Sequence, residues 1–106
     1  MNFLKPILRT KAYSKYMTLI PDVYLIKWNP KERSDIHNHN DKQCDFMILN
    51  GSLHECRFKT NKIGSLYQNQ SLKPFQVYSI NDKEGYHQLY NFDDSIKYSI
   101  HRYTSI

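Results

Sequence analysis

Short apolar runs separated by turn residues recur along this chain about every ten residues, and this spacing constrains its fold more than any other feature. The run Val23–Trp28 is rich in β-branched and aromatic residues and ends at Asn29-Pro30, where the chain must turn. We expect strands at residues 23–28, 44–49, 52–59, 66–67, 75–80, 85–91 and 96–103. Seven or eight short strands indicate an all-β fold, which could be a sandwich, a barrel or a jelly roll.

The first 20 residues lack this pattern. Residues 10–17 are rich in Lys, Ala and Tyr, and they predict either a short helix or an irregular segment that caps the barrel.

Asn50-Gly51 between two apolar runs predicts a two-residue hairpin turn, because both central residues of a type I′ turn need a positive φ. Cross-strand partners share a face, so the register of this hairpin divides the side chains into two groups. Cys44, Phe46, Ile48 and Leu53 would lie on one face, and His54 and Cys56 on the other. We therefore expect His54 to be a surface residue and not a ligand, although a slip of one residue would reverse this assignment.

Composition and charge exclude several classes of protein. The chain of 106 residues is long enough for a single domain, residues 1–106, with a modest core. Its formal net charge is +5, but eleven of the fifteen basic residues are scattered lysines, whereas a nucleic-acid surface clusters them on one face. The charge favours small acidic ligands, and we expect no nucleic-acid partner.

Neither a membrane-spanning segment nor a secretory signal is expected. No window approaches the roughly 20 apolar residues of a spanning helix, and Lys5-Pro6 interrupts the N-terminal apolar residues. The two cysteines are expected on opposite faces and therefore unbridged. These features predict a cytoplasmic protein without a membrane partner, and we expect a monomer or a weak dimer.

The stretch from His37 to Cys44 carries a first candidate site. On an extended strand, residues i and i+2 share a face, so His37 and His39 could bind one metal ion such as zinc, iron, copper or nickel. His87 is a third candidate ligand, because distant strands of a double-sheet roll can line one cavity. The alternative is a pair of polar residues on a solvated strand or loop.

A second polar group lies on the last expected strand. Ser99, His101 and Tyr103 alternate along it and therefore share one face. This face is either the solvent face or the lining of a polar pocket. The pocket is favoured, because the other face, with Tyr98, Ile100 and Arg102, is no better as a solvent face.

The order of these residues resembles the cupin superfamily and, within it, the cysteine dioxygenase family. The motif reads His37-x-His39, Cys44, Gly51, His87-x-x-x-Asn91 and Ser99-x-His101-x-Tyr103. Cys44 stands where general cupins carry a Glu, which is the departure typical of cysteine dioxygenases. The likeness covers roughly residues 12–105.

This resemblance implies a small cupin-type jelly roll (a double-stranded β-helix) with a mononuclear, non-haem Fe(II) centre. Its ligands would be His37, His39 and His87. In this family, both atoms of O2 pass to the sulfur of a small thiol such as L-cysteine, and the product is a sulfinic acid. The implied partners are therefore a small thiol and O2.

The resemblance also assigns roles around the metal. Tyr103, Cys44 and His101 would be the catalytic group, and Cys44 and Tyr103 would be joined by a thioether bond as in the animal-type enzymes. Ser99 and His101 would orient Tyr103 by hydrogen bonds. The alternative for Cys44 is a buried, small apolar residue.

The sequence departs from the family pattern at the residues that bind the substrate. The family binds the substrate carboxylate with an Arg that follows an aromatic residue, and the matching segment here is Tyr13-Ser14-Lys15. Tyr13 and Lys15 are thus the expected substrate-binding residues, but Lys lacks the bidentate fork of Arg, which leaves room for thiols other than cysteine. Arg9 and Arg33 are alternative carboxylate partners. The sequence also stops three residues after Tyr103, which predicts a minimal roll with an open cavity.

Two other functions remain as alternatives to a thiol dioxygenase. One is a metal-binding cupin without dioxygenase activity that serves as a binding or sensing module. The other is a basic β-barrel that binds nucleic acid and needs no metal.

Overall fold

The computed structural model describes residues 5–105, and strands make up most of this part of the chain. In chain order the elements are β1 (Leu8–Arg9), β2 (Tyr13–Met17), β3 (Val23–Trp28), β4 (Lys42–Ile48), β5 (Leu53–Phe58), the 3-10 turn η1 (Ile63–Ser65), β6 (Leu66–Leu72), β7 (Val77–Ile80), β8 (Tyr86–Tyr90) and β9 (Lys97–Ser105). No helix of residues 5–105 is long and apolar enough to cross a membrane.

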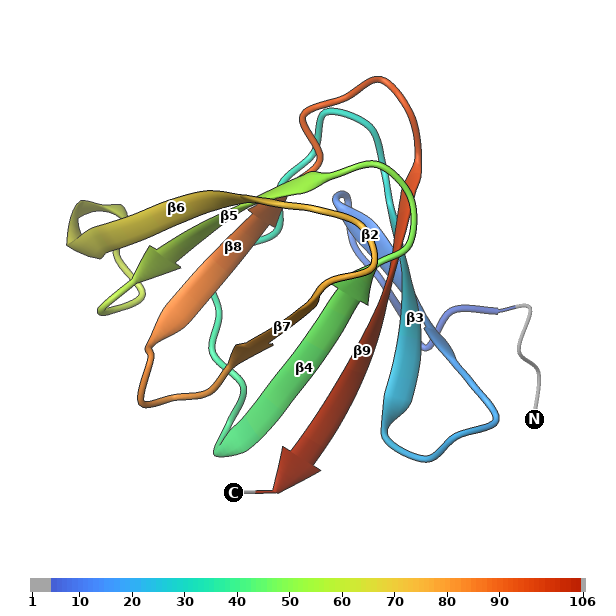
Figure 1. Cartoon of the computed structure of the whole chain (residues 1–106), viewed down its shortest axis with the longest axis horizontal. Helices are drawn as coiled ribbons and strands as arrows, with labels where there is room; N and C mark the ends of the chain where they lie inside the picture. The colour runs from blue at the N-terminus through green and yellow to red at the C-terminus, as the bar shows by residue number, and fades with distance from the viewer. Residues whose placement is uncertain (1–4, 106) are drawn as a thin grey trace.

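The strands form two antiparallel sheets. The larger sheet has the order β1-β2-β3-β9-β4-β7, and the smaller has the order β6-β5-β8. Figure 1 shows the two sheets as separate layers, with β9 between β3 and β4. This arrangement is the cupin-type jelly roll that the resemblance predicted, and a jelly roll is one of the three all-β folds that the strand spacing left open.

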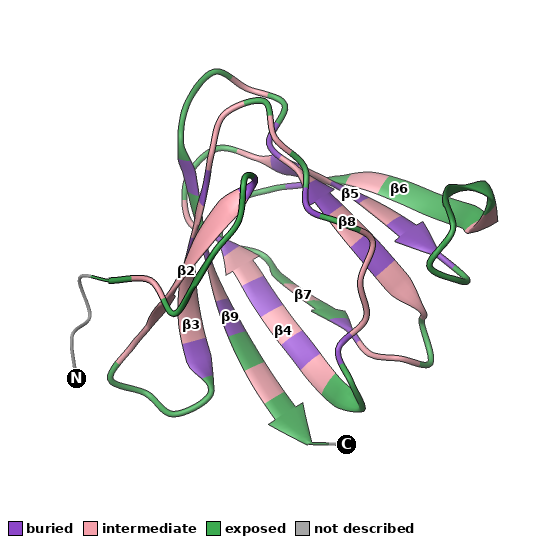
Figure 2. Cartoon of the chain, turned by 180° about the vertical axis from the view of Figure 1, so that it is seen from behind, coloured by how far each residue is buried: buried purple, intermediate pink, exposed green. Residues whose placement is uncertain are grey.

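The core lies between the two sheets because side chains alternate along each strand. In β4 the buried residues are Cys44, Phe46 and Ile48, and Figure 2 shows buried and less buried positions alternating along this strand. The core cluster also takes residues from both sheets: Ile26, Trp28, Leu53, Leu72, Ile80 and Leu89. Side chains on the inner faces can therefore meet across the gap.

The predicted helix at residues 10–17 is wrong. Residues 13–17 form β2, which pairs along its whole length with β3, and Tyr13 packs on Trp28 with ring centroids 5.0 Å apart. This pairing overrides the weak helical preference of Lys and Ala. The consequence for the site is large, because a strand brings alternate side chains of this segment to the inner face.

The predicted hairpin at Asn50-Gly51 is also wrong. Gly51 has the expected positive φ of 65°, but β4 and β5 belong to different sheets. Asn50 instead bonds the loop before β9: its Nδ2 donates to the Ile96 carbonyl (3.1 Å), and its Oδ1 accepts from the Tyr98 amide (2.7 Å). These bonds hold the chain where it crosses between the sheets.

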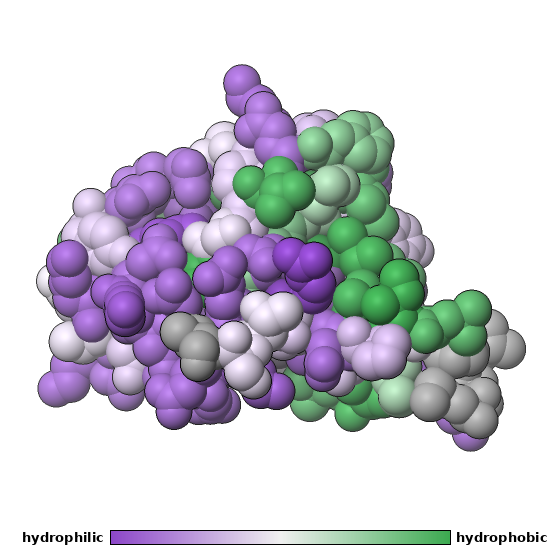
Figure 3. Space-filling view, turned by 60° about the horizontal axis from the view of Figure 1, so that its bottom comes forward, coloured by the Kyte–Doolittle hydropathy of each residue, from purple (hydrophilic) through white to green (hydrophobic). Residues whose placement is uncertain are grey.

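Some large apolar side chains lie outside the core. Leu19 and Ile20, in the turn between β2 and β3, are 86% and 61% exposed. Figure 3 shows hydrophobic residues gathered on one side of the molecule and hydrophilic residues over most of the other. The face in this view is therefore polar mainly over one half.

Replacement of a core residue should destabilise the fold far more than the same replacement at the surface. Ile80 is completely buried, so Ile80→Ala removes apolar contacts and leaves a cavity, at an expected cost of about 2–5 kcal/mol in the free energy of unfolding. Ile63 is 76% exposed, and Ile63→Ala should change it by less than about 0.5 kcal/mol. Urea titrations of both variants and the wild type test this, and equal losses would contradict the assigned core.

Candidate metal centre

Three histidines meet between the sheets although they come from distant parts of the chain. His37 and His39 lie in the loop at residues 29–41, and His87 lies in β8. The His37 amide donates to the His87 carbonyl (3.0 Å), and the His87 amide donates to the His37 carbonyl (2.9 Å). In place of the expected extended strand, the loop has two isolated antiparallel bridges to β8, Arg33 with Tyr90 and His37 with His87.

The loop continues into a turn that positions His39. Asn40 and Asp41 both have positive φ values (50° and 65°), a conformation in which Asn and Asp are enriched. The Asp82 carboxylate accepts from the amides of His39 (3.1 Å) and Asp41 (2.9 Å), and these bonds lower the pKa of Asp82. Asp82 thus joins the loop to the turn before β8, which carries the third histidine.

The three imidazoles are arranged closely enough to share one ion. Their ring centroids lie 4.6 Å (His37–His87), 4.8 Å (His39–His87) and 5.2 Å (His37–His39) apart. One nitrogen of each ring falls within 4.8 Å of those of the other two. Nδ1 of His39 is buried and has no hydrogen-bond partner, whereas buried polar atoms normally have one.

The hydrogen bonds of His37 and His87 determine where their lone pairs point. Nδ1 of His87 lies 2.9 Å from a Glu55 carboxylate oxygen, and Nδ1 of His37 lies 3.0 Å from the Asp35 carbonyl oxygen. Both partners are acceptors, so each Nδ1 carries the proton and each Nε2 carries a lone pair. The two Nε2 atoms lie only 3.1 Å apart, where two lone pairs repel unless a proton or a metal ion lies between them. This observation supports a metal centre.

The electrostatics of the site keep His37 and His39 in the form that binds metal. Burial, aided by the nearby His87, lowers the pKa of His37 to about 4 and that of His39 to about 3. Both imidazoles are therefore neutral at pH 7, as metal ligation requires.

A cavity of about 350 Å³ adjoins the three histidines. Its other walls include the side chains predicted to bind substrate, Tyr13 and Lys15, and also Tyr24 and Tyr103. Lys15 Nζ lies 4.5 Å from the ring centroids of both Tyr24 and Tyr103 and 3.4 Å from the Tyr103 hydroxyl. Burial lowers its pKa, and no carboxylate in residues 5–105 forms an ion pair with it.

The other two predicted carboxylate partners are elsewhere. Arg9 is exposed in β1, and the Arg33 guanidinium stacks on Tyr90 at 4.7 Å; neither lines the cavity. His54, expected at the surface, is partly exposed and does not belong to the histidine cluster.

Cys44 and Tyr103 are direct cross-strand partners in the pairing of β4 with β9. Cys44 is fully buried, and burial raises the pKa of its thiol to about 12. Burial also raises the pKa of Tyr103 above its usual value, so its hydroxyl stays protonated. The structure thus brings together the two residues that the resemblance pairs, although they are 59 positions apart.

Ser99 and His101 occupy the same face of β9 as Tyr103, as alternation predicted, but their contacts differ from the expected ones. Ser99 Oγ lies 2.7 Å from His101 Nε2, and His101 Nδ1 lies 3.7 Å from the Cys44 sulfur. Among the described residues, no hydrogen bond joins His101 to Tyr103. Trp28 Nε1 donates to Ser99 Oγ (2.8 Å), which leaves the serine proton for His101 Nε2 and the His101 Nδ1 proton for Cys44.

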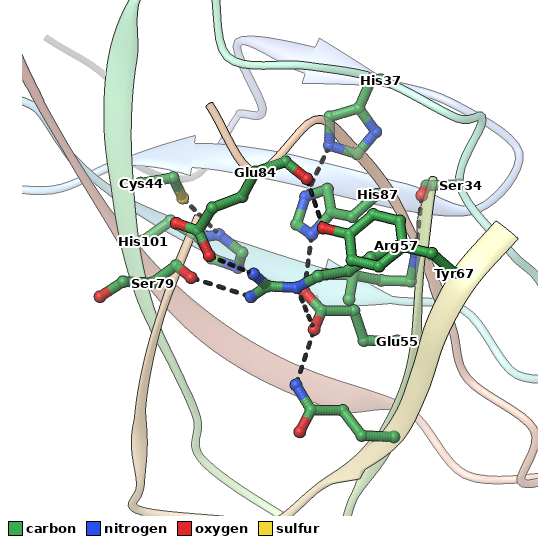
Figure 4. A network of polar contacts seen from close by, with 12 residues as sticks. Ser34, His37, Cys44, Glu55, Arg57, Tyr67, Ser79, Glu84, His87 and His101 are labelled. Atoms are coloured by element: carbon green, nitrogen blue, oxygen red, sulfur yellow. Dashed lines mark hydrogen bonds and ion pairs between the residues drawn. The ribbon is translucent and has the colours of Figure 1, made fainter. Parts of the chain in front are cut away.

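Sequence reasoning missed Glu55. Its carboxylate is completely buried beneath His87 and is held by Arg57, as Figure 4 shows. Gln70 Nε2 also donates to it. These hydrogen bonds outweigh the effect of burial and lower the pKa of Glu55 to about 2. A signal was present, because alternation from the core residue Leu53 places Glu55 and Arg57 on the inner face.

Comparison with known families agrees with this geometry. The model of the family described as cysteine dioxygenase type I matches residues 20–105. The chain belongs to the cysteine dioxygenase type I family. The match includes the three histidines, Cys44 and Tyr103, but Tyr13 and Lys15 precede it.

Solved structures confirm the cupin fold. The Drosophila melanogaster CENP-C cupin domain has a TM-score of 0.71 at 10% identity, and the match covers 92% of this chain and 73% of that one. The cupin domain of an XRE family transcriptional regulator from Enterobacter cloacae has a TM-score of 0.68 at 15% identity, with 91% and 99% covered.

Oxalate oxidase, a third similar structure, has a TM-score of 0.64 at 18% identity, and the match covers 78% of this chain. This chain spans only 41% of the length of that protein. Within the cysteine dioxygenase family, the shared fold and the three-histidine cluster support a bound metal.

Burial should separate the two cysteines in their reactivity. We expect iodoacetamide at pH 8 to alkylate the partly exposed Cys56 but not Cys44 in the folded, metal-free chain, because Cys44 is inaccessible and its thiol pKa is high. Intact mass should show one adduct in the native state and two in guanidinium chloride. Cys56→Ala is the control, and native alkylation of that variant would contradict the burial of Cys44.

Proposed function

We propose that this chain is a mononuclear, non-haem Fe(II) thiol dioxygenase. It converts a small thiol, RSH, and O2 into the sulfinic acid RSO2H, and L-cysteine is the first candidate substrate. Three clustered histidines beside an open cavity carry this proposal, and membership of the cysteine dioxygenase type I family supports it. A bound Fe(II) ion would supply the redox chemistry that lets O2 react with a thiolate.

The residues of the chain would bind and orient the substrate. His37, His39 and His87 would hold the metal, and the unpaired charge of Lys15 would attract a substrate carboxylate into the cavity. Because the Tyr103 oxygen accepts from Lys15, its own proton remains free to donate to a bound molecule or to Cys44. Exclusion of water by the surrounding aromatic rings strengthens each of these contacts.

Lys15 should determine which thiols are used. Lys15→Met keeps the length of the side chain but removes the charge that pairs with a carboxylate. Loss of a charged hydrogen bond of about 1.5–3 kcal/mol should raise KM for L-cysteine and 3-mercaptopropionate about 10- to 100-fold. KM for cysteamine, which has no carboxylate, should change by less than about twofold.

Oxygen uptake and sulfinate formation with Fe(II) measure these effects. Lys11→Met is the matched control, because the Lys11 side chain is 87% exposed. Absence of turnover with all three thiols would sink the dioxygenase proposal. Metal binding without turnover would instead support the alternative, a cupin that acts as a binding or sensing module.

Cys44 and Tyr103 should become joined by a thioether during turnover. In that step a carbon–sulfur bond forms, the thiol hydrogen and one ring hydrogen are lost, and O2 accepts the two electrons and two protons. Intact mass should then show a species two hydrogen atoms lighter after incubation with Fe(II), thiol and O2. The species should be absent from Cys44→Ala and retained in Cys56→Ala; its presence in Cys44→Ala would refute the pairing.

A further inference from the structure

Glu55 is a carboxylate inside the core that forms an ion pair with Arg57, and burial of such a group is costly unless it is paired and hydrogen-bonded. Its partners are fully specified. Oε2 lies 2.9 Å from Nδ1 of His87, and Oε1 accepts from Arg57 Nε (2.9 Å) and Gln70 Nε2 (2.9 Å). A carboxylate held on both oxygens cannot rotate, so it presents a fixed acceptor to the histidine.

The three histidines are not equivalent. Only His87 contacts a buried anion. Nδ1 of His37 faces a backbone carbonyl, with the exposed Asp35 carboxylate at 3.7 Å, and Nδ1 of His39 has no partner. A hydrogen bond to a carboxylate makes an imidazole a stronger electron donor through its other nitrogen. His87 is therefore the most electron-rich of the three candidate ligands.

Arg57 limits the increase in electron donation that Glu55 gives to His87, and it also connects Glu55 to neighbouring parts of the fold. Its side chain is only 8% exposed, and besides Glu55 it donates to Glu84 Oε2 (2.7 Å) and the Ser79 carbonyl (2.8 Å), as Figure 4 shows. One cation thus serves two carboxylates. Glu84 lies three residues before His87, so the same guanidinium holds the turn from which β8 starts.

We propose that Glu55 is a positioning residue for the metal centre: it fixes the proton of His87 on Nδ1, directs the Nε2 lone pair toward His37 and His39, and donates negative charge through the ring, which Arg57 partly offsets. This role rests on the metal-binding part of the proposed function and is independent of thiol oxidation.

The first test is metal affinity. Glu55→Gln keeps the size and one acceptor of the side chain but removes its charge. We expect the Kd for Co(II), and for Fe(II) under anaerobic conditions, to rise about 10- to 100-fold in isothermal titration. Glu32→Gln is the matched control, because it removes the same charge from a partly exposed side chain that pairs only with exposed Lys11, and it should leave Kd unchanged.

The second test separates positioning by charge from a structural role. In the iron-loaded protein, loss of a nearby anion destabilises Fe(III), so Glu55→Gln should raise the Fe(III)/Fe(II) midpoint potential. Arg57→Gln removes the cation and should lower it. Damage to the fold would not produce opposite shifts, and circular dichroism of the metal-free chains reports on folding. If Glu55→Gln alone does not fold, the double variant with Arg57→Gln leaves no unpaired charge in the core, because the remaining carboxylate, Glu84, is 43% exposed, and it should bind metal more weakly than Arg57→Gln alone.

The outcomes distinguish this proposal from the proposed function. Wild-type affinity in a Glu55→Gln variant, or potential shifts of the same sign in both single variants, would overturn the role of Glu55. A wild-type chain that binds neither Co(II) nor Fe(II) would overturn the metal centre and both proposals. A chain that binds metal, shows the expected shifts and oxidises no thiol would overturn only the dioxygenase activity.

Discussion

Two backbone hydrogen bonds between His37 and His87 hold the candidate metal centre together. The loop that carries His37 and His39 belongs to no strand, and it is fixed on β8 by this bridge, by a second bridge between Arg33 and Tyr90, and by the bond from the Ser34 amide to the Leu89 carbonyl. Asp82 adds a further attachment through the amides of His39 and Asp41. Every later feature of the site depends on this docking, because it brings two lone pairs within 3.1 Å of each other.

The site also depends on the separation of the two sheets. The metal cluster comes from the loop and the small sheet, whereas Lys15, Cys44 and Tyr103 project from the large sheet. The cavity between them is bounded by a cation and tyrosines on one side and by imidazoles on the other. A molecule with a carboxylate at one end and a soft donor at the other fits this polarity.

Much of the site followed from alternation and spacing, even where the assumed geometry was wrong. The hairpin at Asn50-Gly51 does not exist, yet Cys44 and Leu53 do share the core, because alternation within each strand is independent of the partner strand. The resemblance, not periodicity, singled out Tyr103 as the neighbour of Cys44. Lys15 was expected from the motif, but its place over two tyrosine rings required the strand that replaced the predicted helix.

Contacts between residues far apart in the sequence could not be predicted from the sequence. Glu55 could have been assigned to the inner face, but nothing in its neighbourhood shows that it lies under His87, 32 positions away. The contact of His101 with Cys44 likewise depends on the register of β4 against β9 and not on local pattern. Polar residues on a predicted core face therefore merit as much attention as conspicuous histidines.

The place of β9 in the large sheet has a consequence for biosynthesis. Strands β3 and β4 are separated in that sheet by residues 97–105, so neither gains its central neighbour until these residues have left the ribosome. Pairing between strands that are far apart in the sequence slows folding, because the entropy cost of closing the intervening loop is met before the contacts form. The nascent chain therefore exposes these unpaired strand edges until residues 97–105 emerge, and His101 and Tyr103 reach the pocket in the same step that closes the sheet.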